Sequence, residues 1–404
     1  MHAPTERPHP SRGTILLLGS LTAFGALTID LYLPALPAIA RDFGVDAAAA
    51  QHTLVAFFIG IALGQLVYGP ISDRIGRRPP LLFGVGVYII ASLGCVVAPT
   101  IDWLVLGRFA QGLGCCAGMV VARSVVRDRF DHQDSARIFS LLTLVLGAAP
   151  MIAPTIGGWL VGFASWRWLF GILAGFGVAV GLAVFFRLDE SRSVATEAKA
   201  RAETPLAAYA DLLQQRRLLG YLAVSALNGA TLFSYIAGSS DLVITIWRFT
   251  PQQFGLVFAF IAFGVIGSSQ VNRWLLARHA ADRILAVAAP VSALCGLALL
   301  GGALADLGTW PMLALFFVTL TSNGFIGANA LAGALAVDPL RSGSASGLFG
   351  SSSFMVGAGA ATLAGLFHDG TARPLAAVMA GGLCLGTLAL YTLALPRRGE
   401  GELS

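Results

Sequence analysis

Two charged residues inside apolar stretches are the first candidates for chemistry in this sequence. Asp30 lies in TIDLYLPALP, which also contains Pro34 and Pro37, and Arg108 lies in a second apolar stretch. A charged side chain within a membrane span is costly and usually functional. Helix rise would place Asp30 roughly 12 Å and Arg108 roughly 8 Å below the same membrane surface. We therefore expect the two groups to share a polar cavity, directly or through water.

The pair has more than one possible role. Asp30 can be a titrating group whose protonation is tied to opening toward either side of the membrane, which would make both residues proton-coupling groups. Alternatively, Asp30 and Arg108 form a structural ion pair between two helices, or Asp30 lies near the outer surface and is solvated. Pro34 and Pro37 follow Asp30, where they can bend or end the helix.

Membrane-spanning helices must position these residues. Only 12% of the 404 residues are charged and 56% are hydrophobic, whereas a soluble domain is about a quarter charged. The sequence predicts an all-α integral membrane protein with twelve transmembrane helices in two six-helix halves, 14–186 and 218–395. The linker 187–217 is polar, and its later part predicts a short surface helix. The predicted spans are 14–38, 50–71, 79–99, 103–123, 136–162, 166–186, 218–240, 253–275, 283–304, 309–335, 342–366 and 374–395.

The distribution of basic residues predicts the orientation. If the N-terminus is inside, 21 of the 26 Lys and Arg residues lie on the inner side, 4 lie in outer loops and 1 lies within a span. Basic residues favour the cytoplasmic side, so both termini and the linker are predicted to be cytoplasmic. The net charge of +5 then reflects orientation and contact with lipid rather than nucleic acid. The five cysteines have no metal-ligand spacing, so no metal site is predicted.

Two further segments are candidates for conformational gates. GPISDRIGRRPPL, residues 69–81, has an ordered spacing that is too specific for an ordinary basic turn. GAAPMIAPTIGGW, residues 147–159, combines prolines that can kink a helix with glycines that allow close approach. We expect this segment to form a moving seam with the other half, where residues 342–365 are similarly rich in small residues. The candidate gate residues are Gly69, Asp73, Arg74, Gly76, Arg77, Arg78, Pro150, Pro154, Gly157 and Gly158.

These segments together resemble the major facilitator superfamily. Residues 69–81 look like its loop 2–3 signature, whose Asp and Arg form a latch with helix 11. Residues 108–128 and 147–159 are similar to the helix 4 and helix 5 motifs of drug:proton antiporters, in which the leading Arg is tied to proton transfer. TIDLYLPALP and the segments YIAGSSDLVI and TPQQFG look closest to the Bcr/CflA subfamily, which exports bicyclomycin, phenicols and related drugs. Ala153 replaces the usual helix 5 Gly, and Thr22 stands where some relatives carry a second acid.

The resemblance implies proton-coupled efflux of small, mostly neutral or zwitterionic drugs by alternating access. The expected protein is a monomer in the bacterial inner membrane that uses the proton gradient and no cofactor. The alternative is a proton-coupled exporter of an endogenous metabolite, such as an amino acid or peptide. An enzyme or ATP-driven pump is not expected, because the sequence has neither a P-loop nor a nucleophile motif. The candidate substrate-binding residues, any of which can instead serve helix packing, are Tyr32, Gln111, Asn228, Tyr235, Phe258, Asn323 and Phe349.

Overall fold

The computed structural model describes residues 12–130, 132–192, 197 and 204–395. This part of the chain is helical throughout, without strands, and contains twelve helices that are long and apolar enough to cross a membrane. The predicted fold class is therefore confirmed. The twelve candidate spans are Gly13–Phe43, Ala47–Ile75, Arg78–Val96, Ile101–Arg129, Val145–Phe163, Arg167–Arg187, Arg216–Ile246, Pro251–Leu276, Ala281–Leu304, Thr309–Val337, Ser342–Leu366 and Arg373–Ala394.

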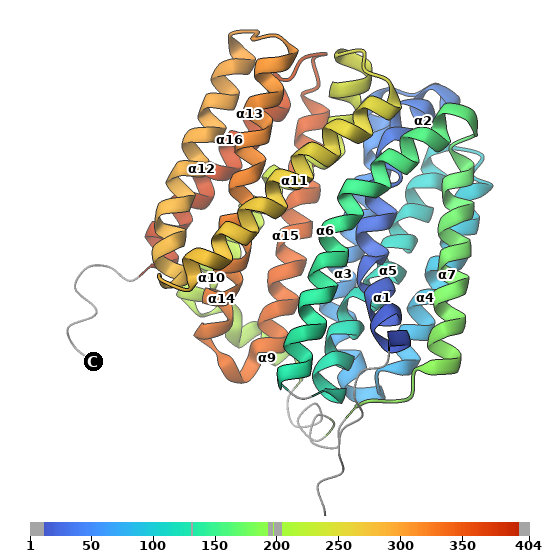
Figure 1. Ribbon diagram of the computed structural model, residues 1–404, viewed down its shortest axis with the longest axis vertical. Helices are drawn as coiled ribbons and strands as arrows, with labels where there is room; N and C mark the ends of the chain where they lie inside the picture. Colours follow the sequence, from blue (N-terminus) through green and yellow to red (C-terminus); the bar gives the residue numbers. More distant parts are fainter. Residues whose placement is uncertain (1–11, 131, 193–196, 198–203, 396–404) are drawn as a thin grey trace, which may run out of the picture.

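The helices lie in two groups that stand side by side (Figure 1). The first group contains α1 (Arg12–Asp30), α2 (Leu36–Phe43), α3 (Ala47–Ile75), α4 (Arg78–Val96), α5 (Ile101–Arg129), α6 (His132–Phe163) and α7 (Arg167–Arg187). The second contains α10 (Arg216–Ser240), α11 (Pro251–Leu276), α12 (Ala281–Leu304), α13 (Thr309–Thr321), α14 (Gly327–Val337), α15 (Ser342–Leu366) and α16 (Arg373–Ala389). The main contacts between the groups are α3 with α15 and α6 with α11.

This contact pattern corrects one expectation. The glycine- and proline-rich segment of α6 does meet the other half, but its partner is α11 rather than the small-residue-rich α15. A Cβ on Gly255 of α11 would lie only 2.6 Å from the Cα of Thr155. The small residues of α15 serve a different seam, because α15 packs against α3. Two separate seams therefore join the halves.

Polar side chains cap the first turns of several helices. These helices begin at the end of the molecule opposite Arg74, Arg77 and Arg78. Asp46 accepts the Ala49 N–H at 2.7 Å before α3, and Thr100 accepts the Trp103 N–H at 3.3 Å before α5. Thr250 and Gln253 form a reciprocal capping box at the start of α11. Such caps satisfy N–H groups that have no partner inside the helix.

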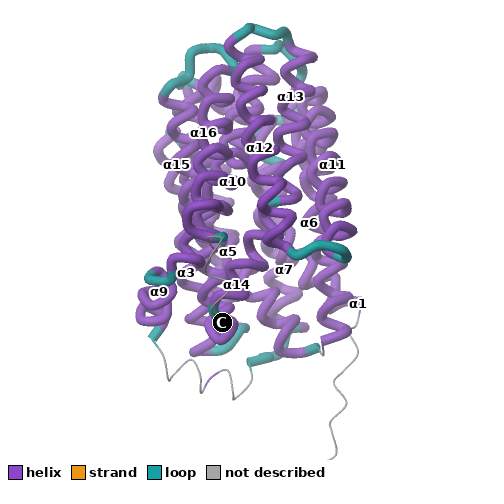
Figure 2. The backbone as a smooth tube through the Cα atoms, turned by 90° about the vertical axis from the view of Figure 1, so that its left-hand side faces the viewer, coloured by secondary structure: helices purple, strands orange, loops and turns teal. Residues whose placement is uncertain are grey.

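A short helix lies across the other end of the molecule, which we call the arginine-rich end because it carries Arg74, Arg77 and Arg78 (Figure 2). This helix, α9 (Pro205–Leu213), lies within the linker where a short helix was predicted, and its position at a membrane surface stays a prediction. Leu212 is buried, whereas Leu206 is 81% exposed. Only part of its apolar surface is therefore used in packing within the described chain.

The first span is interrupted near its middle. α1 ends at Asp30, a single 3₁₀ turn (η1, Leu33–Ala35) follows, and α2 continues to Phe43. Pro34 and Pro37 occupy the first turns of η1 and α2, where a missing N–H breaks no helical hydrogen bond. The expected bend at the prolines is confirmed, but the span ends five residues beyond the predicted residue 38. The tenth span is also interrupted, by the 3₁₀ segment η3 (Ser322–Phe325) between α13 and α14.

Candidate functional site

Arg108 is the largest fully buried side chain of the first half. Its guanidinium carbon lies 4.4 Å from the ring centroid of Tyr32, 4.3 Å from that of Phe57 and 5.8 Å from that of Phe170. Nη1 donates to the Gln111 Oε1 at 2.5 Å, while Nε and Nη2 have no hydrogen-bond partner. Aromatic faces, rather than a carboxylate, therefore surround this cation.

Tyr32 and Gln111, two predicted substrate contacts, hold Arg108 in place. The Tyr32 hydroxyl is 2.6 Å from the Thr53 hydroxyl, which fixes the ring that covers the guanidinium. Gln111 accepts from Arg108 and donates to the Ser92 hydroxyl at 2.7 Å. Both side chains are fully buried, so their observed contacts are with protein.

Asp30 lies at the break in the first span and does not pair with Arg108. Thr28, which is 2.8 Å from the Tyr88 hydroxyl, and Tyr32 both face the interior of the first half. Asp30 lies roughly 200° around the helix from Thr28, so its side chain points away from that interior. The described residues contain no ion pair between Asp30 and Arg108, so the predicted structural ion pair is absent. Asp30 is only 4% exposed and its Oδ2 has no hydrogen-bond partner, so the solvated alternative is wrong as well.

The second half contributes buried polar groups and aromatic rings. Tyr235 on α10 stacks on Phe258 of α11 with ring centroids 5.9 Å apart, and its hydroxyl is buried without a partner. Neither amide atom of Asn323, at the break in the tenth span, has a hydrogen-bond partner, and the Asn228 Oδ1 also lacks one. Buried polar atoms are normally satisfied, so these groups are candidates for contact with a ligand or water. Sequence reasoning missed Phe316, whose ring centroid is 5.6 Å from that of Tyr235.

Three phenylalanine rings bridge the two halves. The Phe58 centroid, on α3, is 4.8 Å from that of Phe233 and 6.0 Å from that of Phe354, and the last two are 4.5 Å apart. Phe354 was not singled out from the sequence, although it is one of few large residues in a small-residue helix. Phe349, which was predicted to bind substrate, instead packs against a separate cluster that contains Tyr221.

The loop between α3 and α4 is anchored within the first half. Arg77 is 3% exposed, donates from Nε to the Asp128 carboxylate at 2.8 Å and from Nη1 to the Ser72 hydroxyl at 2.8 Å, and also pairs with Asp73. Among the described residues, no hydrogen bond joins Asp73 to α15, and the Asp73 carboxylate pairs with Arg77. The contacts of the predicted latch therefore join α3 and α4 to α5 in this structure.

Glu190, just after α7, binds the loop between α3 and α4. Sequence reasoning missed this residue. Its carboxylate accepts the Arg77 N–H at 2.8 Å and the Arg78 N–H at 3.1 Å, and so caps the start of α4. Burial by itself would raise the pKa of Glu190, but backbone N–H donors outweigh it and hold the pKa below its ordinary value. Gly76, with a φ of +102°, adopts the left-handed conformation that brings this carboxylate close.

The remaining gate candidates divide between loop and helix. Arg78 donates to the Phe185 carbonyl at 2.6 Å, the Arg74 carbonyl accepts from Arg192, and Gly69 borders a cavity at the arginine-rich end. Pro150 and Pro154 lie inside α6, which continues through both. The role of these five residues in gating stays a prediction.

Gly157 and Gly158 contact two different elements. A Cβ on Gly157 would overlap the Leu31 carbonyl, at the break in the first span. A Cβ on Gly158 would overlap the Pro251 carbonyl, at the start of α11 in the other half. Glycine is needed at both positions because backbone, which cannot rotate away, occupies the space.

Comparison with known proteins decides the family. The model of the Major Facilitator Superfamily matches residues 16–362. The chain belongs to this superfamily. It is accordingly a multi-pass membrane transporter and not an enzyme. The relatives described next confirm its similarity to the Bcr/CflA drug:proton antiporter group.

The superfamily relatives include named resistance proteins. The chain is 32% identical to a bicyclomycin resistance protein homolog of Haemophilus influenzae over 379 residues, covering 94% of this chain and 95% of that one. It is 29% identical to the multidrug resistance protein MdtL of Klebsiella pneumoniae, covering 80% of each chain. The MFS-type transporter YdgK of Bacillus subtilis is 32% identical over the full length of both.

Solved transporters share the fold. The nucleoside transporter NupG superposes with a TM-score of 0.75 at 14% identity, over 94% of this chain and 99% of that one. A D-xylose-proton symporter superposes with a TM-score of 0.71 at 11% identity, over 95% and 97% of the two chains. At these identities the likeness establishes the architecture alone.

Proposed function

We propose that this transporter exports small neutral or zwitterionic drugs of the phenicol or bicyclomycin type in exchange for protons. The observation that carries the proposal is the position of Asp30, a nearly buried acid without a partner at a break in a membrane helix. A charged carboxylate at such a place needs a counter-charge or water, whereas the neutral acid does not. The proton occupancy of Asp30 would therefore change as the surroundings of the break change.

Interrupted helices are typical of transporter sites, because freed backbone groups and polar side chains can meet an ion or substrate there. Both breaks of this chain carry a polar side chain without a full set of partners, Asp30 in one half and Asn323 in the other. Gly157 couples the first break to α6, which packs on the second half. Movement between the halves would thus change the contacts and the solvation of the Asp30 carboxylate. This change would link proton release to alternating access.

Arg108 acts in this proposal as a fixed positive charge in the first half. Its aromatic enclosure and its bond to Gln111 keep the guanidinium in place without a carboxylate. A fixed cation would oppose cationic substrates. The drug would contact the second half, where Tyr235, Phe258, Asn228 and Asn323 combine rings with neutral polar groups. This composition, together with the names of the bicyclomycin and multidrug resistance relatives, supports uncharged drugs as substrates.

The proposed setting is the bacterial inner membrane, with both termini and the arginine-rich end in the cytoplasm. The protein would act as a monomer and use the proton gradient without a cofactor. An exporter of an amino acid or peptide remains the second candidate function, because the same neutral and zwitterion-compatible groups would suit such metabolites.

Everted membrane vesicles test the proposal. Chloramphenicol, florfenicol and bicyclomycin are added in turn to energised vesicles, and proton release is followed with a pH-sensitive dye. We expect release with at least one drug for the wild type, no release for Asp30→Asn, and normal release for Asp102→Asn, which changes an exposed acid on α5. An unchanged response in Asp30→Asn would remove Asp30 from proton coupling. A response to amino acids or dipeptides but to no drug would instead favour the second candidate.

A further inference from the structure

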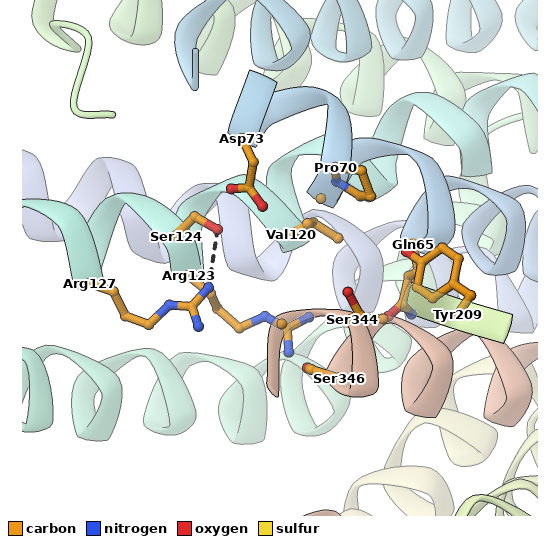
Figure 3. A pocket seen from close by; sticks show the side chains of 13 residues that line it. Gln65, Pro70, Asp73, Val120, Arg123, Ser124, Arg127, Tyr209, Ser344 and Ser346 are labelled. Atoms are coloured by element: carbon orange, nitrogen blue, oxygen red, sulfur yellow. Dashed lines mark hydrogen bonds between the residues drawn. The ribbon is translucent and has the colours of Figure 1, made fainter. Parts of the chain in front are cut away.

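A cavity of about 190 Å³ lies between the two halves at the arginine-rich end (Figure 3). Its walls come from α3 and α5 of the first half, from α15 of the second half and from Tyr209 of α9. It contains none of the residues that the efflux proposal uses for protons or drugs. Its chemistry therefore needs a separate account.

Two arginines of α5 line this cavity and have no carboxylate partner among the described residues. Arg123 and Arg127 lie one helical turn apart and so share a face of α5. Arg123 donates from Nε to the Met119 carbonyl at 3.0 Å, and Arg127 donates to the Ser124 hydroxyl at 3.4 Å. Within the described residues, neither forms an ion pair. Two like charges at this spacing repel each other, so the pair is a local concentration of positive charge at the cavity wall.

Neighbouring arginines show that acids were available for pairing at this end. Arg77 pairs with Asp128 and Asp73, and Arg129 lies 3.9 Å from Asp189. Asp73 also lines the cavity, and Arg77 pairs with both Asp73 and Asp128, so these three groups together carry one negative charge against the two positive charges of Arg123 and Arg127. Among the described residues, Arg123 and Arg127 are therefore without an ion pair although acids lie on neighbouring segments.

The opposite wall adds neutral donors. α15 begins at Ser342 without a side-chain cap, and Ser344 and Ser346 of its first turns line the cavity. Figure 3 shows the Arg123 side chain extending from α5 toward these two serines. The first N–H groups of a helix and its dipole favour an anion, and hydroxyl groups can donate to the same anion.

We propose that this cavity binds a phosphate group, held by Arg123 and Arg127 from one half and by the start of α15 from the other. Guanidinium groups match phosphate oxygens in geometry, and several converging donors suit a tetrahedral anion better than a single carboxylate. The phosphate can belong to a soluble compound or to the headgroup of an anionic lipid. A bound phosphate would join the halves at this end and stabilise the arrangement described here. The inference is independent of drug efflux.

Phosphate binding is measured on the purified full chain in a neutral detergent. Inorganic phosphate is titrated at constant ionic strength with chloride as the balancing anion, and thermal unfolding and heat of binding are recorded. For the wild type we expect saturable binding and a rise in Tm. The double variant Arg123→Gln/Arg127→Gln should bind at least tenfold more weakly. Arg129→Gln, which removes a neighbouring arginine of the same helix, should bind as the wild type does.

A second variant and a lipid experiment keep the test decisive. Ser346→Glu keeps both arginines but places a negative charge in the cavity, and it should abolish phosphate binding while the protein stays monodisperse. Native mass spectrometry after release from nanodiscs with and without phosphatidylglycerol then separates the sources. Retention of phosphatidylglycerol that requires Arg123 and Arg127, without a response to inorganic phosphate, assigns the site to lipid. Absence of both responses, or responses unchanged in the double variant, would overturn the proposal.

Discussion

The guanidinium carbon of Arg108 lies 4.4 Å from the ring centroid of Tyr32, on the face of the first span opposite to that of Asp30. The two intramembrane charges are thus separated by the helix that carries one of them. Arg108 is held by rings and by Gln111, whereas Asp30 lies at a helix end next to the seam with α6. Their contributions to transport should therefore be separable by mutation.

Tyr32→Leu should reduce drug-dependent proton release about tenfold or more at equal protein level. A buried cation–π contact contributes about 2 kcal/mol, and its loss would free the Arg108 side chain from its fixed position. Tyr32→Phe keeps the ring and loses only the hydrogen bond to Thr53, which contributes about 1 kcal/mol, so it should retain most activity. Vesicle assays of both variants check this. Equal losses in the two variants would show that the hydroxyl, not the ring, matters.

Gly158→Leu should stop transport while leaving membrane insertion intact. A side chain at residue 158 meets the Pro251 carbonyl, so the seam between α6 and α11 would be forced apart. Overpacking of this kind costs about 1–3 kcal/mol. Gly171→Leu on α7 is the matched control, since a Cβ there meets open space. Drug efflux is measured for both variants at equal amounts of membrane protein. Normal efflux from Gly158→Leu would show that this seam does not move during transport.

Phe354→Ala should raise the drug concentration needed for half-maximal proton release by about three- to tenfold. The substitution removes the contact of Phe354 with Phe58 of the first half and its contact with Phe233 of the second half, and an aromatic pair contributes about 0.5–1.5 kcal/mol. Phe263→Ala, which removes a ring that is 61% exposed, should leave the value unchanged. Dose–response curves for both variants provide the measurement. An equal rise of the half-maximal drug concentration in Phe354→Ala and Phe263→Ala would indicate a general effect of lost apolar surface.

The contribution of Glu190 to stability should depend on pH. Its pKa is held below the ordinary value of 4.5, so the ionised form is favoured in the folded protein. The stabilisation is therefore fully present above about pH 4.5 and is lost as pH falls through the lower folded-state pKa. Glu190→Gln should lower the free energy of unfolding by about 1 kcal/mol or less at pH 7, because the carboxylate is largely exposed.

Thermal unfolding in detergent at pH 7 and below pH 4 checks the role of Glu190. The difference in Tm between wild type and Glu190→Gln should shrink in acid. Asp189→Asn is a suitable control, since that neighbouring acid makes no contact with the α4 N–H groups among the described residues. A difference that stays constant with pH would argue against the charged cap.

Much of the fold could be predicted from the sequence. Runs of about 20 apolar residues must form helices in a bilayer, because only internal hydrogen bonds can satisfy the backbone there. The twelve spans follow from that constraint and are confirmed. Helical spacing in the linker predicted a helix where α9 lies, and the prolines predicted the bend that is seen at Pro34. Hydropathy is averaged over a turn or more, so it could not locate the break that starts at Asp30 or the one at Asn323.

The sequence alone also determined which residues are costly in a membrane: Asp30, Arg108 and the polar side chains of the second half. Depth along a helix follows from residue number, and on that basis Asp30 and Arg108 were expected to be partners. Only the tertiary structure decided which way each side chain points and which helix packs on which. A rotation of two residues turns a side chain by roughly 200°, which separates groups at similar depth. For the same reason, helix packing and not composition placed α6 on α11, Phe354 beside Phe233, and Arg123 and Arg127 opposite the start of α15.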